Sequence, residues 1–421
     1  MSSGIVLGLG GTVDYEIEWD AAVLEEAARV YGVTASELDT AVAVVDERSL
    51  VVSVLSFLRE GRGGERFVAT PAALEEFSAR FRYASTLGGT CVRAALAMAR
   101  LGVPSTVHLV SIDDTVRRQL PPEVSYLNSA TRDSTEPHVI VQYPAGAAVE
   151  LPDALIVAPH PNRLIYVNDL PNRELVLAPQ LGDLVAEARA FLASGFNTIQ
   201  DRAILEDRLG RVAGAIARMA AGGVALFEDA GSHDAAHGLR VRDAMAAVVD
   251  VYGLNEDELF GYLGGAFDLL DPDAVEDALR AASELIPAPI LVVHTKHWAV
   301  AVGDDAERWG SALDGGVTMA GTRFRVGDAL TAADYAATRL LPRQERAARF
   351  AVELEQRFSG QAVCIPAYKL DVAAPTTIGL GDSFVGGFIA GMMSSDAVDS
   401  GPAAGRRVAA SVERIAKGAR S

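Results

Sequence analysis

The residues best suited to chemistry lie near the C-terminus, in the run Gly379-Leu380-Gly381-Asp382. Its glycines allow a tight turn that presents backbone N–H groups to an anion. The apolar and small residues at 383–393 predict a buried helix whose N-terminus adds partial positive charge. An anion hole beside one carboxylate favours phosphoryl transfer to a hydroxyl, since the N–H groups neutralise the phosphoryl group and the carboxylate takes the proton. The same pattern is also typical of a turn that only joins a strand to a helix.

The elements that would position this turn alternate regularly from about residue 185 onward. We expect helices at 183–193, 204–221, 235–247, 274–284 and 343–357, and strands at 224–227, 249–252, 290–294 and 298–302. A buried strand at 5–7 opens the chain. Alternation of this kind predicts an α/β fold with a mainly parallel sheet and helices on both faces. The first 170 residues are less regular, with β-type runs at 138–143 and 164–167, and predict a smaller second domain.

Polar side chains follow several of these strands. Asp14 comes after the first strand, Glu228 after 224–227, and Asn255 and Glu258 after 249–252. Ligands of open α/β sheets bind beyond the carboxyl ends of the strands, so these residues and Asp382 could surround one crevice. Each alone is also typical of a turn or a helix cap, and Asn255 could simply cap the helix that it begins.

The composition narrows the possible partners. Of 421 residues, 37 are lysine or arginine and 56 are acidic, which gives a net charge of -19 and argues against nucleic acid and anionic membranes. A locally basic site for an anionic substrate is still compatible with this charge. With two cysteines, Cys91 and Cys364, we expect no disulfide framework. We also expect no signal peptide and no membrane span, hence a cytoplasmic protein that is a monomer or a small homo-oligomer.

Short motifs occur in order over nearly the whole chain, and together they resemble one family. They are Thr12-Val13-Asp14, Gly61-Arg62-Gly63-Gly64-Glu65, Leu87-Gly88-Gly89, Pro159-His160-Pro161-Asn162-Arg163, Gly195-Phe196-Asn197, Asn255-Glu256-Asp257-Glu258, His294-Thr295, and Thr377 to Asp382. In this order they resemble the motifs of the ADP-dependent sugar kinases, the ADP-dependent glucokinases and phosphofructokinases, a branch of the ribokinase-like superfamily. The last motif is nearly identical to the family's Thr-Val-Gly-Leu-Gly-Asp.

The resemblance implies a ribokinase-like three-layer sandwich with a mainly parallel central sheet and a smaller α+β lid domain. The large nucleotide-binding domain would comprise residues 1–14, 84–130 and 170–421, and the lid 15–83 and 131–169. The implied activity is transfer of a phosphoryl group from a nucleotide, ADP being favoured, with Mg²⁺, to a hydroxyl of a sugar or sugar phosphate.

The resemblance also implies roles for single residues. Asp382 would be the general base, and Gly379, Leu380 and Gly381 would form the anion hole. The substrate would be bound by Asp14, Glu65, Gly88, Gly89 and Arg163. The nucleotide would be bound by Asn255, His294, Thr295 and Thr377. Glu228 and Glu258 would orient Mg²⁺, mostly through waters, because Mg²⁺ dehydrates reluctantly.

Three positions depart from the family pattern. Leu226 replaces the histidine of the family's His-x-Glu, Thr12 replaces an asparagine, and His160 replaces an arginine. Alternatives therefore stay open: an ATP-dependent ribokinase-like sugar or nucleoside kinase, or a non-catalytic sugar or nucleotide sensor on the same fold. A third alternative is a transition-metal site at His233 and His237. The lid offers Arg62, Arg66, Arg132 and Arg163 for a phosphate, and the motifs do not say which of them contact one.

Overall fold

The computed structural model describes residues 4–232, 234–372, 376 and 378–394. Within these residues the larger sheet has nine strands. In order across the sheet they are β16 (Ala362–Pro366), β15 (Trp298–Gly303), β14 (Ile290–His294), β13 (Val251–Asn255), β12 (Val224–Glu228), β11 (Ala190–Ala193), β1 (Ile5–Leu7), β5 (Ser105–Leu109) and β6 (Val124–Asn128). All neighbours from β14 to β6 pair in parallel, and only β15 pairs antiparallel, with β14 and β16.

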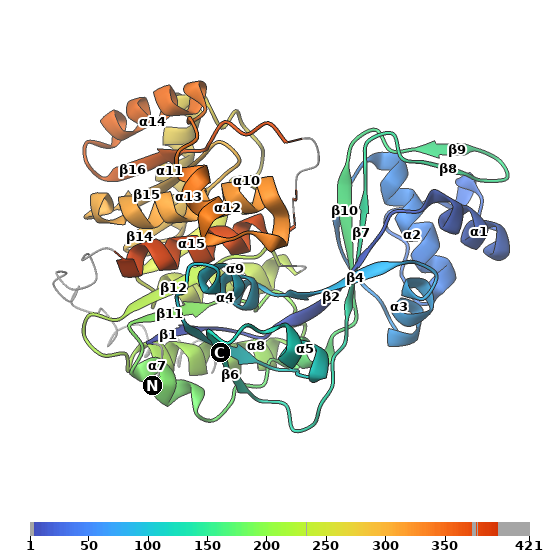
Figure 1. Ribbon diagram of the computed structural model, residues 1–421, viewed down its shortest axis with the longest axis horizontal. Coiled ribbons are helices and arrows are strands. Elements are labelled where there is room, and N and C mark those ends of the chain that lie inside the picture. The colour runs from blue at the N-terminus through green and yellow to red at the C-terminus, as the bar shows by residue number, and fades with distance from the viewer. Residues whose placement is uncertain (1–3, 233, 373–375, 377, 395–421) are drawn as a thin grey trace.

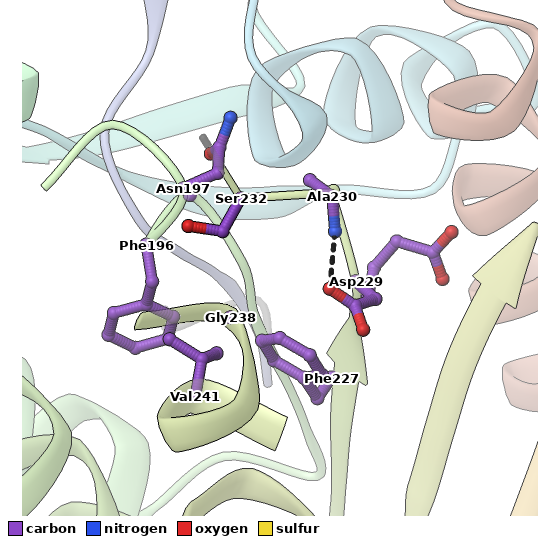
Figure 2. A pocket seen from close by; sticks show the side chains of 10 residues that line it. Phe196, Asn197, Phe227, Asp229, Ala230, Ser232, Gly238 and Val241 are labelled. Atoms are coloured by element: carbon purple, nitrogen blue, oxygen red, sulfur yellow. Dashed lines mark hydrogen bonds between the residues drawn. The ribbon is translucent and has the colours of Figure 1, made fainter. Parts of the chain in front are cut away.

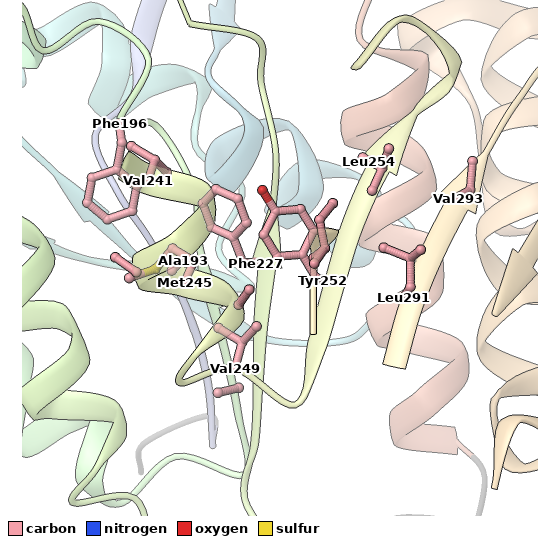
Figure 3. Packing of buried hydrophobic residues seen from close by; sticks show 14 of the residues in the cluster. Ala193, Phe196, Phe227, Val241, Met245, Val249, Tyr252, Leu254, Leu291 and Val293 are labelled. Atoms are coloured by element: carbon pink, nitrogen blue, oxygen red, sulfur yellow. The ribbon is translucent and has the colours of Figure 1, made fainter. Parts of the chain in front are cut away.

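Both faces of this sheet are covered by helices. One face packs against α7 (Leu181–Ala186), α8 (Arg202–Ile216), α9 (Ala235–Ala246), α11 (Pro272–Leu285) and α14 (Glu345–Phe358). Figure 3 shows part of this core, where the ring of Phe227 lies beside that of Tyr252. The other face packs against α4 (Thr90–Ala99), α12 (Gly310–Val326) and α15 (Leu380–Ser394). Burial on both faces explains the continuous apolar runs of the strands, and the predicted three-layer fold class is confirmed.

A second sheet has five strands within the described part of the chain. Their order is β3 (Gly64–Phe67), β10 (Asn162–Val167), β7 (His138–Tyr143), β2 (Thr12–Ile17) and β4 (Tyr83–Gly88). One face packs against α1 (Ala21–Tyr31), α2 (Glu47–Glu60) and α3 (Pro71–Ser78) in a core of its own, next to the hairpin of β8 (Ala148–Glu150) and β9 (Leu155–Val157). In Figure 1 these helices stand apart from the nine-stranded sheet, and β2 and β4 run between the two bodies.

Side chains alternate between the faces of the five-stranded sheet, since the strand period is two. Val139, Val141, Leu164 and Tyr166 belong to the core under the helices. The alternate residues of these strands, and those paired beside them, share the opposite, open face. It carries the polar and charged side chains of Thr12, Asp14, Glu16, Glu65, Thr86, His138 and Arg163 together with Ile140 and Ile165.

Four shorter helices complete the described elements that bear on the site: α5 (Asp114–Gln119), α6 (Leu170–Glu174), α10 (Glu256–Leu263) and α13 (Ala332–Arg339). Residues 12–17 and 83–88 pair with each other in the five-stranded sheet, although we expected 12–14 and 84–88 in the large domain. The division into a large domain and a lid stays a prediction. No helix among the residues described here is long and apolar enough to cross a bilayer.

The helix expected at 183–193 is wrong in its second half. Helix α7 ends at Ala186, and residues 190–193 form the strand β11, buried on both faces between β12 and β1. Ala-Phe-Leu-Ala lacks any alternation of apolar and polar residues because both of its faces are covered, and a short apolar run of this kind fits a helix equally well.

Candidate active site

The glycine turn and Asp382 lie at the start of α15. Gly379 has φ 63°, and Ser383 closes the turn by donating its N–H and its hydroxyl to the carbonyl of Gly379, at 3.0 and 2.8 Å. Helix α15 begins at Leu380, which places Asp382 in its first turn. A Cβ on Gly379 would lie 2.8 Å from Cδ of Arg93, so the turn needs glycine both for its backbone conformation and for this close approach.

Arg93 joins this turn to the five-stranded sheet. It lies on α4, is 4% exposed, and donates through Nη2 to Asp14 at 2.8 Å. Glu16 lies 3.6 Å from the same Nη2, and Asp382 lies 3.9 Å from Nε. The structure therefore brings together Asp14 of β2 and Asp382 of α15 around one buried guanidinium.

The carboxylate of Asp14 is held from several sides. The Thr12 hydroxyl donates to Oδ1 at 2.7 Å, and Nδ1 of His138 lies 3.9 Å from the same oxygen. A Cβ on Gly88 would lie 2.2 Å from the carboxylate, so only glycine fits beside it. Gly89 follows with φ 85° as the residue before α4. Asp14 itself lies within β2, and not in a turn after β1 as expected.

His138 was missed by the sequence analysis. It is buried on β7, and its Nε2 lies 3.1 Å from Asp169, which also accepts hydrogen bonds from the backbone N–H and the side-chain amide of Asn172. Burial lowers the pKa of His138, but the hydrogen bond and charge of Asp169, with Asp14 and Glu65 nearby, raise it to about 9. His138 is therefore a buried cation at neutral pH.

Glu228 and His294 meet at the carboxyl ends of β12 and β14. Both are buried, and Nε2 of His294 lies 2.7 Å from Glu228. Burial raises the pKa of Glu228 more strongly than His294 lowers it, and Glu228 in turn raises the pKa of His294 against the effect of burial. The ring of His294 also stacks on Phe384 and lies against Gly381, which links the pair to the glycine turn.

Asn255 and Glu258 form a capping box at the start of α10. The Asn255 side chain accepts from the N–H groups of Asp257 and Glu258, and Glu258 accepts from the N–H of Asn255 at 2.8 Å. Burial raises the pKa of Glu258 to about 7, partly against the hydrogen bond from Asn255, and Asp229 and Glu228 add to the rise. The capping function that we left open for Asn255 is present in the structure.

Asp229 is an acidic residue that the sequence analysis did not assign to the site. It accepts hydrogen bonds from Tyr252 at 2.6 Å and Tyr262 at 2.5 Å, and from the N–H of Ala230. A small pocket opens here (Figure 2), with Phe196, Phe227 and Val241 on one side and the polar side chains of Asn197 and Ser232 on the other. The motif Gly195-Phe196-Asn197 thus lies beside Glu228 and Asp229.

These carboxylates have a charge that fits a divalent cation. Asp229 raises the pKa of both Glu228 and Glu258, Glu228 also raises the pKa of Glu258, and His294 lowers the pKa of both. Among the described residues no group of three or more His, Cys, Asp and Glu side chains is arranged to hold a metal directly.

The remaining candidates are dispersed. Thr295 has a local role, since its hydroxyl accepts from the N–H groups of His297 and Trp298 in the turn between β14 and β15. Glu65 and the exposed Arg163 lie on the open face of the five-stranded sheet. Thr377 and His233 lie outside the described residues. His237 is buried, with Nδ1 3.3 Å from the carbonyl of Ile199, so that nitrogen faces a backbone carbonyl.

Of the site residues that the sequence analysis did not identify, Arg93 is the one whose place in the sequence indicated a buried and paired charge. It is the single charged residue in the apolar segment 91–99, and a charge at such a place is buried only when it is paired. Leu226, which replaces the family histidine, is buried in the core shared with α4, α12 and α15.

Comparison with known proteins agrees with this fold. A hypothetical ADP-dependent phosphofructokinase from Pyrococcus horikoshii OT3 superimposes with a TM-score of 0.73 at 18% identity, over 92% of this chain and 97% of that one. A structure described as an ADP-dependent kinase complex with fructose-6-phosphate and ADPβS gives a TM-score of 0.67 at 14% identity, over 93% and 94%. Adenosine kinase from Schistosoma mansoni gives 0.52 at 11%, over 100% and 96%. A search of curated proteins found no match.

The fold is ribokinase-like, as the superposition on adenosine kinase also shows. Residues 3–384 match the ADP-specific phosphofructokinase/glucokinase conserved region, and the chain belongs to that family. The predicted family, fold class and enzyme class are therefore confirmed, and the protein is an ADP-dependent sugar kinase by family.

Proposed function

We propose that this protein transfers the terminal phosphoryl group of ADP to a hydroxyl of a sugar or sugar phosphate, with Asp382 as general base and the Gly379–Gly381 turn as anion hole. One observation carries this proposal. The buried guanidinium of Arg93 lies 2.8 Å from Asp14 of the five-stranded sheet and 3.9 Å from Asp382 at the start of α15. The carboxylate that we propose to bind the acceptor and the one that we propose to take its proton therefore lie around the same arginine, which supports an in-line transfer between them.

The proposed reaction is a direct transfer from ADP to the acceptor hydroxyl. Asp382 takes the proton of the acceptor hydroxyl, a bond forms between that oxygen and the terminal phosphorus of ADP, and the bond to the bridging oxygen breaks. The electron pair leaves with AMP. N–H groups of the glycine turn and the N-terminus of α15 stabilise the negative charge on the phosphoryl oxygens. One similar structure carries AMP and another carries fructose-6-phosphate with ADPβS, which supports these ligand classes for the chain.

Glu228 and Glu258 would hold Mg²⁺, which when bound neutralises phosphate charge. Their burial and mutual proximity favour a cation there, as described above. The residues of the chain supply the remaining functions. Asp14, fixed by Thr12 and Arg93, would orient the acceptor hydroxyl, and the open face with Glu16, Thr86 and Glu65 would bind the other hydroxyls.

The arginines of the five-stranded sheet and its helices differ in availability. Arg66 donates to the carbonyls of Thr40 and Val42, and Arg62 pairs with Glu60 at 3.1 Å. Arg163 is exposed on the same face as Asp14 and Glu65. We propose Arg163 as the residue that meets the phosphate of a phosphorylated acceptor.

Donor and acceptor are tested together. A panel of sugars, sugar phosphates and nucleosides is incubated with ADP or with ATP, and AMP and ADP are measured as the respective products. We expect AMP to form from ADP with a sugar or a sugar phosphate. Turnover with ATP alone would establish the ATP-dependent alternative, and binding of both ligands without turnover would establish a sensor.

The base is tested by Asp382→Asn. Its amide cannot take the proton, so we expect kcat to fall by roughly 10²–10⁴-fold, while ADP binding measured by calorimetry stays close to that of the wild type. Asp371→Asn, outside the crevice residues named above, serves as the control. Near-wild-type turnover of Asp382→Asn would remove Asp382 from the role of base.

A further inference from the structure

Two buried arginines flank the glycine turn. Arg93 of α4 is 4% exposed and Arg323 of α12 is 7% exposed. Nε of Arg323 donates to the carbonyl of Ile378 at 2.9 Å, and Arg323 also pairs with Asp328. The side chain of Arg93 lies against Gly379, since a Cβ there would be 3.1 Å from Nη1 and 3.3 Å from Nε. Two successive residues of the turn, Ile378 and Gly379, are thus each contacted by the side chain of a buried arginine.

Both guanidinium groups keep donors that the described residues do not use. Nη2 of Arg93 donates to Asp14, whereas its Nε and Nη1 have no hydrogen-bond acceptor within the described parts of the chain. Nη2 of Arg323 is buried and also lacks a partner there. A buried donor without an acceptor, such as Nη2 of Arg323, is costly, and a phosphate group offers oxygens that would satisfy it.

The charges of the two arginines also favour an anion between them. Burial lowers the pKa of Arg323, and the charge of Arg93 lowers it further against the opposing effect of Asp328. For Arg93, burial lowers the pKa but Asp14 and Asp382 raise it more, so this guanidinium stays charged. The repulsion between the two guanidinium groups is opposed by Asp14, Glu16 and Asp382 beside Arg93 and by Asp328 beside Arg323. An anion bound by donors of both arginines would contact both positive charges directly.

We infer that Arg93 and Arg323 form an anion site on the Gly379 turn, and that this site contacts the phosphoryl group during transfer through Nε and Nη1 of Arg93 and Nη2 of Arg323. This assignment rests on the proposed function, because the anion is the group that the proposed reaction transfers. Arg93 holds the acceptor-binding Asp14 with one edge and faces the turn with another. It would thereby align the two reactants as well as stabilise charge.

The planar fork of arginine is essential to this arrangement, and lysine cannot reproduce it. We would measure kcat and KM for Arg93→Met, Arg93→Lys and Arg323→Met, with the exposed Arg218→Met as the matched control, since Arg218 pairs with Asp183 on the surface at 3.2 Å. The second measurement is binding of orthovanadate in the presence of AMP, which imitates the phosphoryl group in transfer and does not depend on turnover.

For Arg93→Met we expect kcat to fall on the order of 10²–10³-fold, comparable to the loss of an oxyanion-hole donor, with a smaller change in the KM for ADP. Arg93→Lys should recover less than a tenth of wild-type kcat. Vanadate affinity with AMP should fall at least tenfold in each Arg93 and Arg323 variant and stay unchanged in Arg218→Met. In a further variant, Arg93→Ala, added guanidinium ion should partly restore kcat.

Separate results distinguish the failure of this site from the failure of the kinase function. Wild-type turnover of ADP together with near-normal kcat and vanadate affinity in folded Arg93→Lys would overturn the anion site and leave the kinase function standing. A wild-type protein without turnover on any donor would overturn the kinase function. Vanadate binding that is lost in Arg93→Lys and kept in Arg218→Met would still support the anion site in that case.

Discussion

His138 is a buried cation between carboxylates, so the loss of its proton should lower the free energy of unfolding. Its pKa is raised from 6.5 to about 9 in the folded protein, so the folded state holds the proton more tightly than the unfolded chain. The stabilising contribution is therefore complete below pH 6.5 and is lost as the pH rises through about 9. We expect the wild type to lose roughly 3 kcal/mol of unfolding free energy over this interval relative to His138→Gln.

The measurement is urea unfolding of both proteins from pH 6 to pH 10. His160→Gln is the control, since His160 is exposed on the segment before β10. A difference between the wild type and His138→Gln that is constant with pH would show that Asp169 and Asp14 do not hold the proton on His138.

Sequence reasoning identified some of the residues of the site for a clear physical reason. Glu228 and Asp382 were expected together because parallel strands bring their carboxyl ends to one edge, and the structure places His294 between them through its contacts with Glu228 and Gly381. Glu16 and His138 were not identified because they face the crevice only through the pairing of β2, β4 and β7. That pairing depends on segments distant in sequence.

Helices α12 and α15 pack so closely that the position of Asp382 depends on glycines. A Cβ on Gly387 of α15 would lie 2.4 Å from the carbonyl oxygen of Gly315 and 2.5 Å from Cβ of Met319, both on α12. Gly387→Ala must push the helices apart, which we expect to cost about 1–3 kcal/mol of unfolding free energy. It should also lower kcat, because Asp382 lies in the first turn of the displaced helix.

The matched control is Gly210→Ala. Gly210 lies in the exposed middle of α8, and a Cβ there meets nothing within 4 Å. Alanine at that position should raise the unfolding free energy by roughly 0.5–1 kcal/mol through helix propensity and leave kcat unchanged. Equal stabilities for the two variants would contradict the close packing of α12 on α15.

Secondary structure was predicted correctly for helices with apolar residues on one face. It was predicted wrongly where all residues of an element are buried, because the sequence then shows no alternation of apolar and polar residues. The amphipathic helix expected at 343–357 corresponds to α14, Glu345–Phe358, with its buried residues three or four apart. Strand β11 was predicted as a helix because its four residues are all buried. Strand β4 was not predicted at all, because the polar open face and the stacked Tyr15–Tyr83 pair give residues 83–88 no apolar alternation.

The molecule as a whole has cores that belong to different sheets. The core under α1, α2 and α3 shares no buried residue with the two cores that flank the nine-stranded sheet. The chain crosses between the bodies around β2, β4, β7 and β10. Among the described residues, the ion pair of Arg93 with Asp14 also links them. We therefore expect two unfolding transitions, because separate hydrophobic cores lose cooperativity more readily than a shared one.

The three tryptophans report on the bodies separately. Trp19 packs against the core of the five-stranded sheet, near Tyr143, while Trp298 and Trp309 lie in the two cores of the nine-stranded sheet, on Phe350 and Phe388. Fluorescence of a Trp298→Phe/Trp309→Phe variant during urea titration should follow the unfolding of the smaller body, and fluorescence of Trp19→Phe should follow that of the larger one.

We expect different unfolding midpoints for the two bodies without ligands. Acceptor and ADP together should bring the midpoints closer, since ligands that bind only the folded crevice stabilise both of its sides. Coincident midpoints without ligand would show that the bodies unfold as one unit, and would contradict the division of the chain into a large domain and a lid.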